Sequence, residues 1–191
     1  MKQVRIVLVV LLTIGAIEAY RYRVLIETRI WHLRHGDEIV LLDYRVPVPK
    51  NWYVMDTGDD GRLLIRLDTQ DRTGNPMRNR KGRFHAFVSI DFSRTLSTME
   101  RLDFWTSMQT SMVKKQGSEP NQRSFNFNGE TLSCVSGQKF SQIAPRTPQF
   151  LEGDANTGEC MSSGQLQLRF AGTDADMPQV WEIVSHIRKR S

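Results

Sequence analysis

Apolar residues are concentrated in one unbroken run near the start of the chain. Lys2 and Arg5 precede this run, which covers residues 6–17 and ends before the first acidic residue, Glu18. A basic start followed by an apolar stretch indicates an export signal, and the stretch is shorter than the roughly 20 residues of a standard membrane span. We therefore expect residues 1–23 to be a signal anchor or a signal peptide.

The residues after this run bear on whether the segment is cleaved. A site after Ala19 lacks the small-x-small pattern that signal peptidases prefer, because Ile17 and Glu18 precede it. Tyr20 and Tyr22 suit a membrane interface. This favours an uncleaved anchor, whereas cleavage would give a secreted protein. A buried core helix is the third interpretation, which the lack of a polar stripe disfavours.

Residues 24–36 have the spacing of a helix that continues from the apolar segment. Gly36 follows as a favourable C-terminal cap, and the apolar positions of this helix are Leu25, Ile26, Ile30, Trp31 and Leu33. We expect a helical stalk over residues 24–36 and one globular domain over residues 37–191, a length typical of a single core.

The first half of that domain has strand patterns. Residues 38–49 predict an extended segment, which two prolines restrict to a sheet edge. Residues 53–56 and 62–68 flank an acidic turn with two glycines and predict a hairpin. Residues 84–92 predict a further strand in the centre of the sheet.

A helix and two hairpins follow. Ser97 and Glu100 form a capping box, and apolar residues then recur at helical spacing up to Gly117. Segments 124–127 and 130–135 are joined by Asn-Gly, the strongest short hairpin signal. Cys160-Met161 and residues 165–170 predict another strand pair.

The chain is predicted to close with an amphipathic helix. It starts near Asp176, and its apolar face is formed by Met177, Val180, Trp181, Val184 and Ile187. Arg188, Lys189 and Arg190 then suit the negative end of the helix dipole. The order of elements predicts an α+β fold, with amphipathic helices packed on an antiparallel sheet.

Two segments resemble a known family. Val46-Pro-Val-Pro-Lys-Asn-Trp52 stands near the domain start, and Arg169-Phe-Ala-Gly172 precedes the closing helix at Val180-Trp-Glu-Ile-Val-Ser-His-Ile187. Together with the order of elements, they resemble the PsbP-like α/β/α sandwich. The resemblance implies a non-enzymatic accessory module that serves in assembly and protein contacts, and it assigns a role to no individual residue.

Charge adds a candidate surface. The net charge is +5 with a pI near 9.5, and the segment 71–83 holds five basic residues against one acidic residue. We expect an anion-binding loop there, for lipid head groups or envelope polymers, or else a loop that only aids solubility. Nucleic acid is not expected, since interleaved aromatic residues are missing. The candidate residues are Arg78, Arg80, Lys81 and Arg83.

The two cysteines, Cys134 and Cys160, both fall in segments that predict strands. If these strands are neighbours, a disulfide between them would contribute on the order of 3 kcal/mol and would require an oxidising compartment. Two buried free thiols in a cytosolic domain are the alternative. Because basic residues flank both ends of the apolar run, the cysteines are the better guide to orientation, and they favour the periplasmic or extracellular side.

Candidate chemistry is sparse. His32 and His35 lie one helical turn apart near Asp37, but no motif supplies the three or four ligands of a zinc site. We expect the two histidines on the stalk surface, near lipid head groups or the domain edge. No Gly-x-Ser-x-Gly or phosphate-binding motif occurs, and the acidic residues 56–60 lack the spacing of a calcium loop. We predict no catalytic residue, no metal and no cofactor.

The sequence therefore predicts a non-catalytic domain, tethered by its N-terminal helix, that binds a protein partner or an anionic surface in the envelope. One alternative is an envelope hydrolase whose site is assembled from distant residues. Another is a membrane-anchored adaptor that faces the cytosol.

Overall fold

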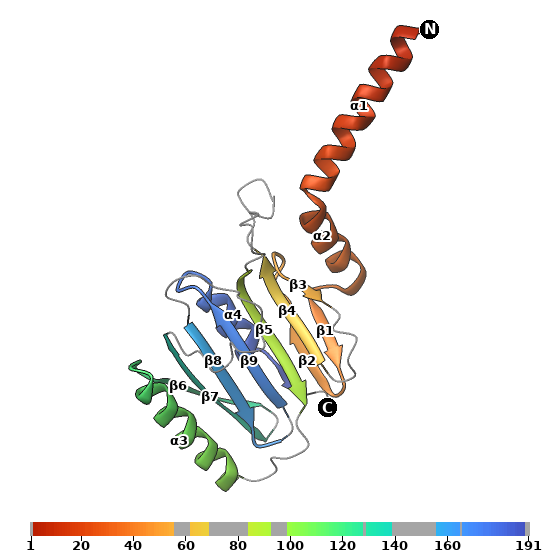
Figure 1. The fold of residues 1–191 in the computed structure, drawn as a ribbon. Helices are drawn as coiled ribbons and strands as arrows, with labels where there is room; N and C mark the ends of the chain where they lie inside the picture. Colours follow the sequence, from red (N-terminus) through yellow and green to blue (C-terminus); the bar gives the residue numbers. More distant parts are fainter. Residues whose placement is uncertain are drawn as a thin grey trace.

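The computed structural model describes residues 2–55, 62–68, 84–92, 99–127, 129–138, 156–164 and 166–189. Two N-terminal helices lead into a body in which helices cover β-sheets (Figure 1). Every strand pairing in the described residues is antiparallel. The fold is α+β, as the sequence predicts.

Helix α1 (Lys2–Arg21) projects away from the sheets (Figure 1). Its large apolar side chains are 50% to 72% exposed, and they are Val4, Ile6, Val7, Leu8, Val9, Val10, Leu11, Leu12, Ile14 and Ile17. Consecutive residues of a helix point in different directions, so this apolar surface encircles α1. Among the described residues, no helix is both long enough and apolar enough to cross a membrane.

Helix α2 (Arg23–His35) follows a break at Tyr22 and contacts the domain. It ends at Gly36, whose φ of 74° and hydrogen bond to the His32 carbonyl (2.8 Å) confirm the predicted helix end. Thr28 is buried, and Trp31 packs against the main core. The predicted stalk is therefore docked on the domain.

His32 connects helix α2 to the domain. Its Nε2 lies 2.9 Å from the Trp52 carbonyl oxygen, and its Nδ1 lies 3.1 Å from Asp37 Oδ1. Only 11% of the side chain is exposed. The surface position expected for His35 is confirmed. His32 lies at the domain edge, one of the two positions that the sequence suggested, because docking of α2 turns its ring toward the segment before β3.

A seven-stranded sheet forms the centre of the domain, in the order β3-β4-β5-β9-β8-β7-β6. The predicted hairpins form, and Gly129 (φ 80°) occupies the tight turn before β7. Strand β5 lies in the interior, as expected. The strands are β3 (Tyr53–Met55), β4 (Arg62–Asp68), β5 (Phe84–Phe92), β6 (Asn121–Phe127), β7 (Glu130–Gln138), β8 (Asn156–Ser162) and β9 (Leu166–Gly172).

A second sheet has three strands, β1 (Glu38–Leu41), β2 (Tyr44–Pro47) and β10 (Arg188–Lys189), in the order β1-β2-β10. The sequence predicted one extended segment over residues 38–49, which was wrong. The chain reverses at Leu42 and Asp43 to pair β1 with β2. Leu42 has a φ of 51°, which is rare for a residue other than glycine, so this turn carries no sequence signal.

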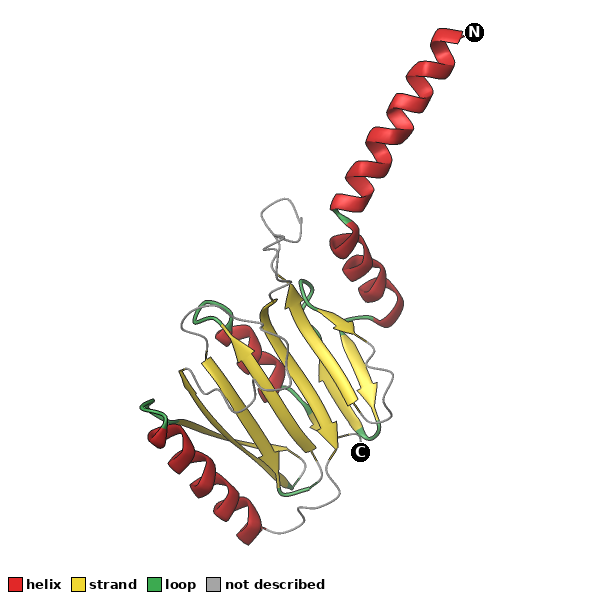
Figure 2. Ribbon diagram, in the orientation of Figure 1, coloured by secondary structure: helices red, strands yellow, loops and turns green. Residues whose placement is uncertain are grey.

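Two helices cover opposite faces of the large sheet and give three layers (Figure 2). Helix α3 (Met99–Lys115) packs Leu102, Trp105 and Val113 against β7 and β8. Helix α4 (Met177–Ser185) packs its apolar side against the other face, in the core that also takes side chains from the small sheet. The end of α3 near Gly117 is confirmed (φ 77°), while the Ser97 cap lies outside the described residues.

The C-terminal segment differs from the expectation. Helix α4 ends at Ser185, and residues 188–189 pair with β2 as strand β10. Arg188 forms an ion pair with Glu38, and Lys189 Nζ lies 2.8 Å from Glu130 Oε1. Arg188 and Lys189 therefore belong to the small sheet and do not extend α4.

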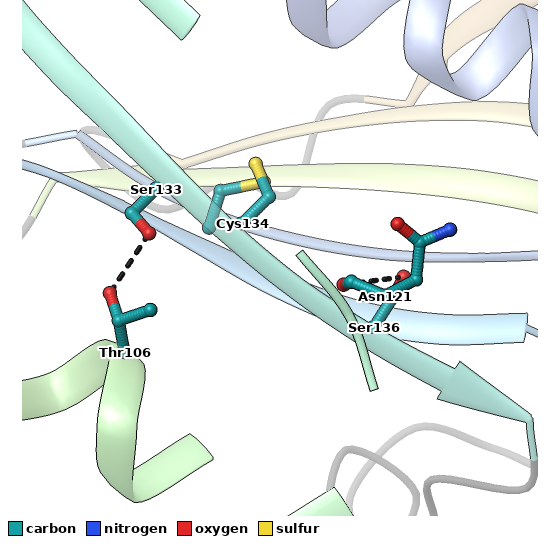
Figure 3. The surroundings of a disulfide bond; sticks show 6 residues. Thr106, Asn121, Ser133, Cys134 and Ser136 are labelled. Carbon is teal, nitrogen blue, oxygen red and sulfur yellow. Dashed lines mark hydrogen bonds between the residues drawn. A yellow bond between two sulfur atoms is a disulfide. The ribbon is translucent and has the colours of Figure 1, made fainter. Parts of the chain in front are cut away.

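Cys134 and Cys160 face each other on neighbouring strands β7 and β8 (Figure 3). Their Cα atoms are 4.0 Å apart and their sulfur atoms are joined in a disulfide. Both side chains are fully buried in the main core. The pairing that the sequence predicted is thus present.

We expect loss of this bond to destabilise the domain. The Cys134→Ala/Cys160→Ala variant should lose about 3 kcal/mol of unfolding free energy in urea titrations, since the unfolded chain is no longer cross-linked. Adding reductant should destabilise the native protein in the same way and leave the variant unchanged. Mass spectrometry after alkylation without reductant checks the premise, and two labelled cysteines in protein from native membranes would contradict it.

Candidate functional site

A pocket of about 560 Å³ opens between the starts of β6 and β8, the end of β7, and α4. We call it the β6–α4 pocket. The side chains around it are mostly polar, and they include the indole of Trp181. It is lined by Asn121, Arg123, Ser136, Asn156, Asp174, Met177, Pro178 and Trp181.

Strand register brings these residues together. Asn121 pairs with Ser136, which in turn pairs with Gly158 of β8. A Cβ atom on Gly158 would lie 2.4 Å from Phe170 Cζ and 2.7 Å from Ser136 Cβ. A residue without a side chain is therefore needed here, because the ring of Phe170 occupies the space beside Ser136.

Trp181 and Arg123 form the centre of the pocket. Trp181 is 9% exposed, and its ring meets the edge of the Phe170 ring at a centroid distance of 4.9 Å. The Arg123 guanidinium carbon lies 4.4 Å above the Trp181 ring, within the range of a cation–π contact. Stacking fixes the guanidinium plane and leaves the N–H groups at its edge free to bind an anion.

Neither group is satisfied within the described part of the chain. Arg123 is exposed and forms no ion pair there, and no hydrogen bond from the Trp181 indole N–H is found there. An indole N–H can only donate, so that of Trp181 is a candidate donor to a ligand. Together with the side-chain amide of Asn121, the site favours a ligand rich in acceptors. A planar carboxylate matches the fork of an arginine, with which it can form two parallel hydrogen bonds.

The remaining polar groups of the pocket are engaged with one another. Asn156 donates a hydrogen bond to Asp174, and the Ser136 hydroxyl lies 3.5 Å from the Asn121 carbonyl oxygen (Figure 3). No histidine lines the pocket in the described residues. Nucleophilic catalysis by Ser136 would need a base within hydrogen-bonding distance, and none is found there. The described arrangement suits binding.

The residues predicted from the sequence lie elsewhere. Arg78, Arg80, Lys81 and Arg83 fall in the segment 69–83, outside the described residues, as do the acidic residues of the 56–61 turn. In the described part of the chain, no group of three or more His, Cys, Asp or Glu side chains is placed to hold a metal ion. Cys134 and Cys160 lie in the core, where their disulfide joins strands that contribute to the pocket.

A second polar cluster connects the two sheets. The Tyr44 hydroxyl donates to Glu130 Oε2 at 3.0 Å, and Lys189 Nζ contacts the same carboxylate. Burial, reinforced by the charge and hydrogen bond of Glu130, raises the pKa of Tyr44 well above its ordinary value. The hydrogen bond to Glu130, and then its charge, also raises the pKa of Lys189. All three groups have partners, so the cluster serves as a structural bridge between the sheets.

Comparison with known proteins adds no family. No protein-family model matches the chain, and no curated protein matches it. The β6–α4 pocket, the exposed helix α1 and the disulfide are therefore the features that bear on function.

We expect the Tyr44 cluster to make the free energy of unfolding fall at alkaline pH. Above the ordinary Tyr pKa of 10.0 the unfolded chain releases the phenolic proton while the folded protein retains it, so folding weakens as pH rises. We expect a loss of up to about 1.4 kcal/mol per pH unit for this proton. Urea unfolding between about pH 9 and about pH 11 measures it.

The Tyr44→Phe variant should lose part of this dependence, although Lys189 would still contribute. A Tyr20→Phe variant, altered on the exposed face of α1, is the matched control. Equal pH profiles for the wild type and the Tyr44→Phe variant would contradict the assignment.

Proposed function

We propose that this protein is a non-catalytic binding domain of the cell envelope, attached to a membrane by α1, which holds a carboxylate-bearing partner in the β6–α4 pocket. The observation that carries the proposal is the guanidinium of Arg123, which stacks on Trp181 in a polar pocket and forms no ion pair with the described residues. An accessory role in assembly, which the PsbP-like resemblance implies, agrees with a domain that binds and does not catalyse.

The exposed apolar surface of α1 supports attachment to a membrane. Burying a large aliphatic side chain contributes roughly 1.5 to 3 kcal/mol, and ten such side chains of α1 are exposed. An apolar surface of this size needs an apolar environment. Lipid is the environment that the basic N-terminus and the following tyrosines favour.

The disulfide between Cys134 and Cys160 supports a location outside the cytoplasm. Stable structural disulfides are rare in the reducing cytosol. The bond between Cys134 and Cys160 is buried in the core, so it forms as the domain folds. This supports a periplasmic or extracellular domain over an adaptor that faces the cytosol.

The pocket is tested with small probes. N-acetylglycine carries a carboxylate and an amide, whereas N-methylacetamide carries the amide alone. In NMR titrations of the full chain in detergent, N-acetylglycine should shift the Trp181 indole N–H signal and N-methylacetamide should not. The signal is assigned by its absence from the Trp181→Phe variant.

Two variants test the role of Arg123 in this titration. Arg123→Gln should abolish the shift, because it removes the charged fork. Arg101→Gln, the same change on α3 across the sheet, should leave it intact. A response that persists in Arg123→Gln, or one that N-methylacetamide reproduces, would rule out the proposed carboxylate site.

The attachment is tested by flotation with phosphatidylcholine vesicles. The full chain should float with the vesicles. A Leu8→Asp/Leu12→Asp variant should not, because two charges in the apolar surface of α1 oppose its transfer into lipid. Replacing Ser107 and Ser111 on the exposed face of α3 by aspartate gives a matched control that should still float. Flotation of the α1 variant to the same extent as the wild type would contradict attachment through this helix.

A further inference from the structure

A second pocket, of about 690 Å³, lies where α2 meets the domain. We call it the joint pocket. One side of this pocket is cationic and the other side is apolar. The residues that matter for its chemistry are Leu25, Arg29, His32, Leu33, Asp37 and Lys50.

The cationic side is formed by Arg29 and Lys50. Both are exposed, and neither forms an ion pair within the described part of the chain. The nearby acid, Asp37, already contacts His32 Nδ1 at 3.1 Å. Two unpaired cations in one pocket produce a positive potential that attracts an anion such as a phosphate.

Docking of α2 brings the two cations together. Arg29 lies on α2, whereas Lys50 lies in the segment between β2 and β3. His32 joins these segments, since it lies three residues after Arg29 and contacts the Trp52 carbonyl oxygen at 2.9 Å. His32 is thus a positioning residue for the pocket, and it leaves both cations free.

The apolar side continues along α2. Leu25 and Leu33 lie on either side of Arg29 at intervals of four residues, and therefore on the same side of the helix. Leu33 is 86% exposed, and Ile26 and Ile30 are each 42% exposed. A helix with an exposed apolar stripe next to basic residues is suited to lie at the surface of a membrane.

We propose that the joint pocket binds the head group of an anionic phospholipid. Arg29 and Lys50 hold the phosphate, and Leu25 and Leu33 contact the first carbons of the acyl chains. The inference rests on the proposed attachment of α1, which brings α2 to the lipid surface, and it adds a preference for lipid type. The combination of two cations with exposed leucines favours a lipid over a free phosphate compound.

Flotation of the full chain with two kinds of vesicle tests the proposal. The wild type should bind vesicles that contain phosphatidylglycerol more strongly than pure phosphatidylcholine vesicles. Arg29→Gln/Lys50→Gln should reduce this preference roughly tenfold, since both charges that face the head group are lost. Its binding to phosphatidylcholine should equal that of the wild type. Arg29 and Lys50 are both exposed, so we expect this variant to fold as the wild type does.

Lys114→Gln/Lys115→Gln is the matched control, with the same change of net charge on α3, far from α1 (Figure 1). It should keep the preference. An equal loss in both double variants would mean that net charge alone acts, and an unchanged preference in Arg29→Gln/Lys50→Gln would mean that the pocket is not used. Either result overturns the proposal.

Two further outcomes are distinguishable. If the wild type fails to float with phosphatidylcholine but binds phosphatidylglycerol through Arg29 and Lys50, attachment by α1 is wrong and the joint pocket stands. A titration with glycerol phosphate, without vesicles, separates lipid from soluble phosphate. Saturation of the pocket by glycerol phosphate as tightly as by the vesicles would assign it to a soluble compound and refute the lipid.

Discussion

Val180, Ile183 and Val184 of α4 are buried in one continuous core with Leu168 and Phe170 of β9, and the small sheet and α2 are positioned by packing on this core. The same core takes Tyr44 and Val46 from the small sheet, and Trp31 of α2 packs on its margin. Trp52 is fully buried and donates its indole N–H to Gln179 Oε1 at 2.6 Å, which fixes the segment before β3 on α4. The β6–α4 pocket and the joint pocket lie at two margins of this core. Each pocket is therefore formed by side chains that the core holds in place.

The elements that the sequence predicted correctly are those with local signals. The hairpin at Gly129 depends on a two-residue turn, and the apolar face of α4 depends on spacing within three turns. The errors have non-local causes. Helix spacing continues past Ser185, but pairing of residues 188–189 with β2 and the ion pair of Arg188 with Glu38 outweigh it. The reversal at Leu42 arises because β1 and β2 pair, which no property of leucine predicts.

The candidate sites could not be predicted, for the same reason. Arg123 in isolation is a polar residue of an edge strand, and its importance depends on the Trp181 ring, which a different part of the chain supplies. His32 and Lys50 likewise become neighbours only when α2 docks. The disulfide was predictable because the two cysteines had no other partners and both lay in strand patterns. Conversely, the basic segment 71–83, the clearest charge signal in the sequence, lies outside the described residues.

The small sheet places a constraint on how the domain is made. Its ion pair between Glu38 and Arg188 joins residues 150 positions apart, so strand β2 cannot acquire its β10 neighbour until the chain has been synthesised past Lys189. Contacts between residues so far apart in the sequence form slowly, since the long intervening segment must be ordered first. Until then Tyr44 and Val46 border an unfinished core. A nascent chain thus passes through a period of exposed apolar surface, to which a chaperone can bind.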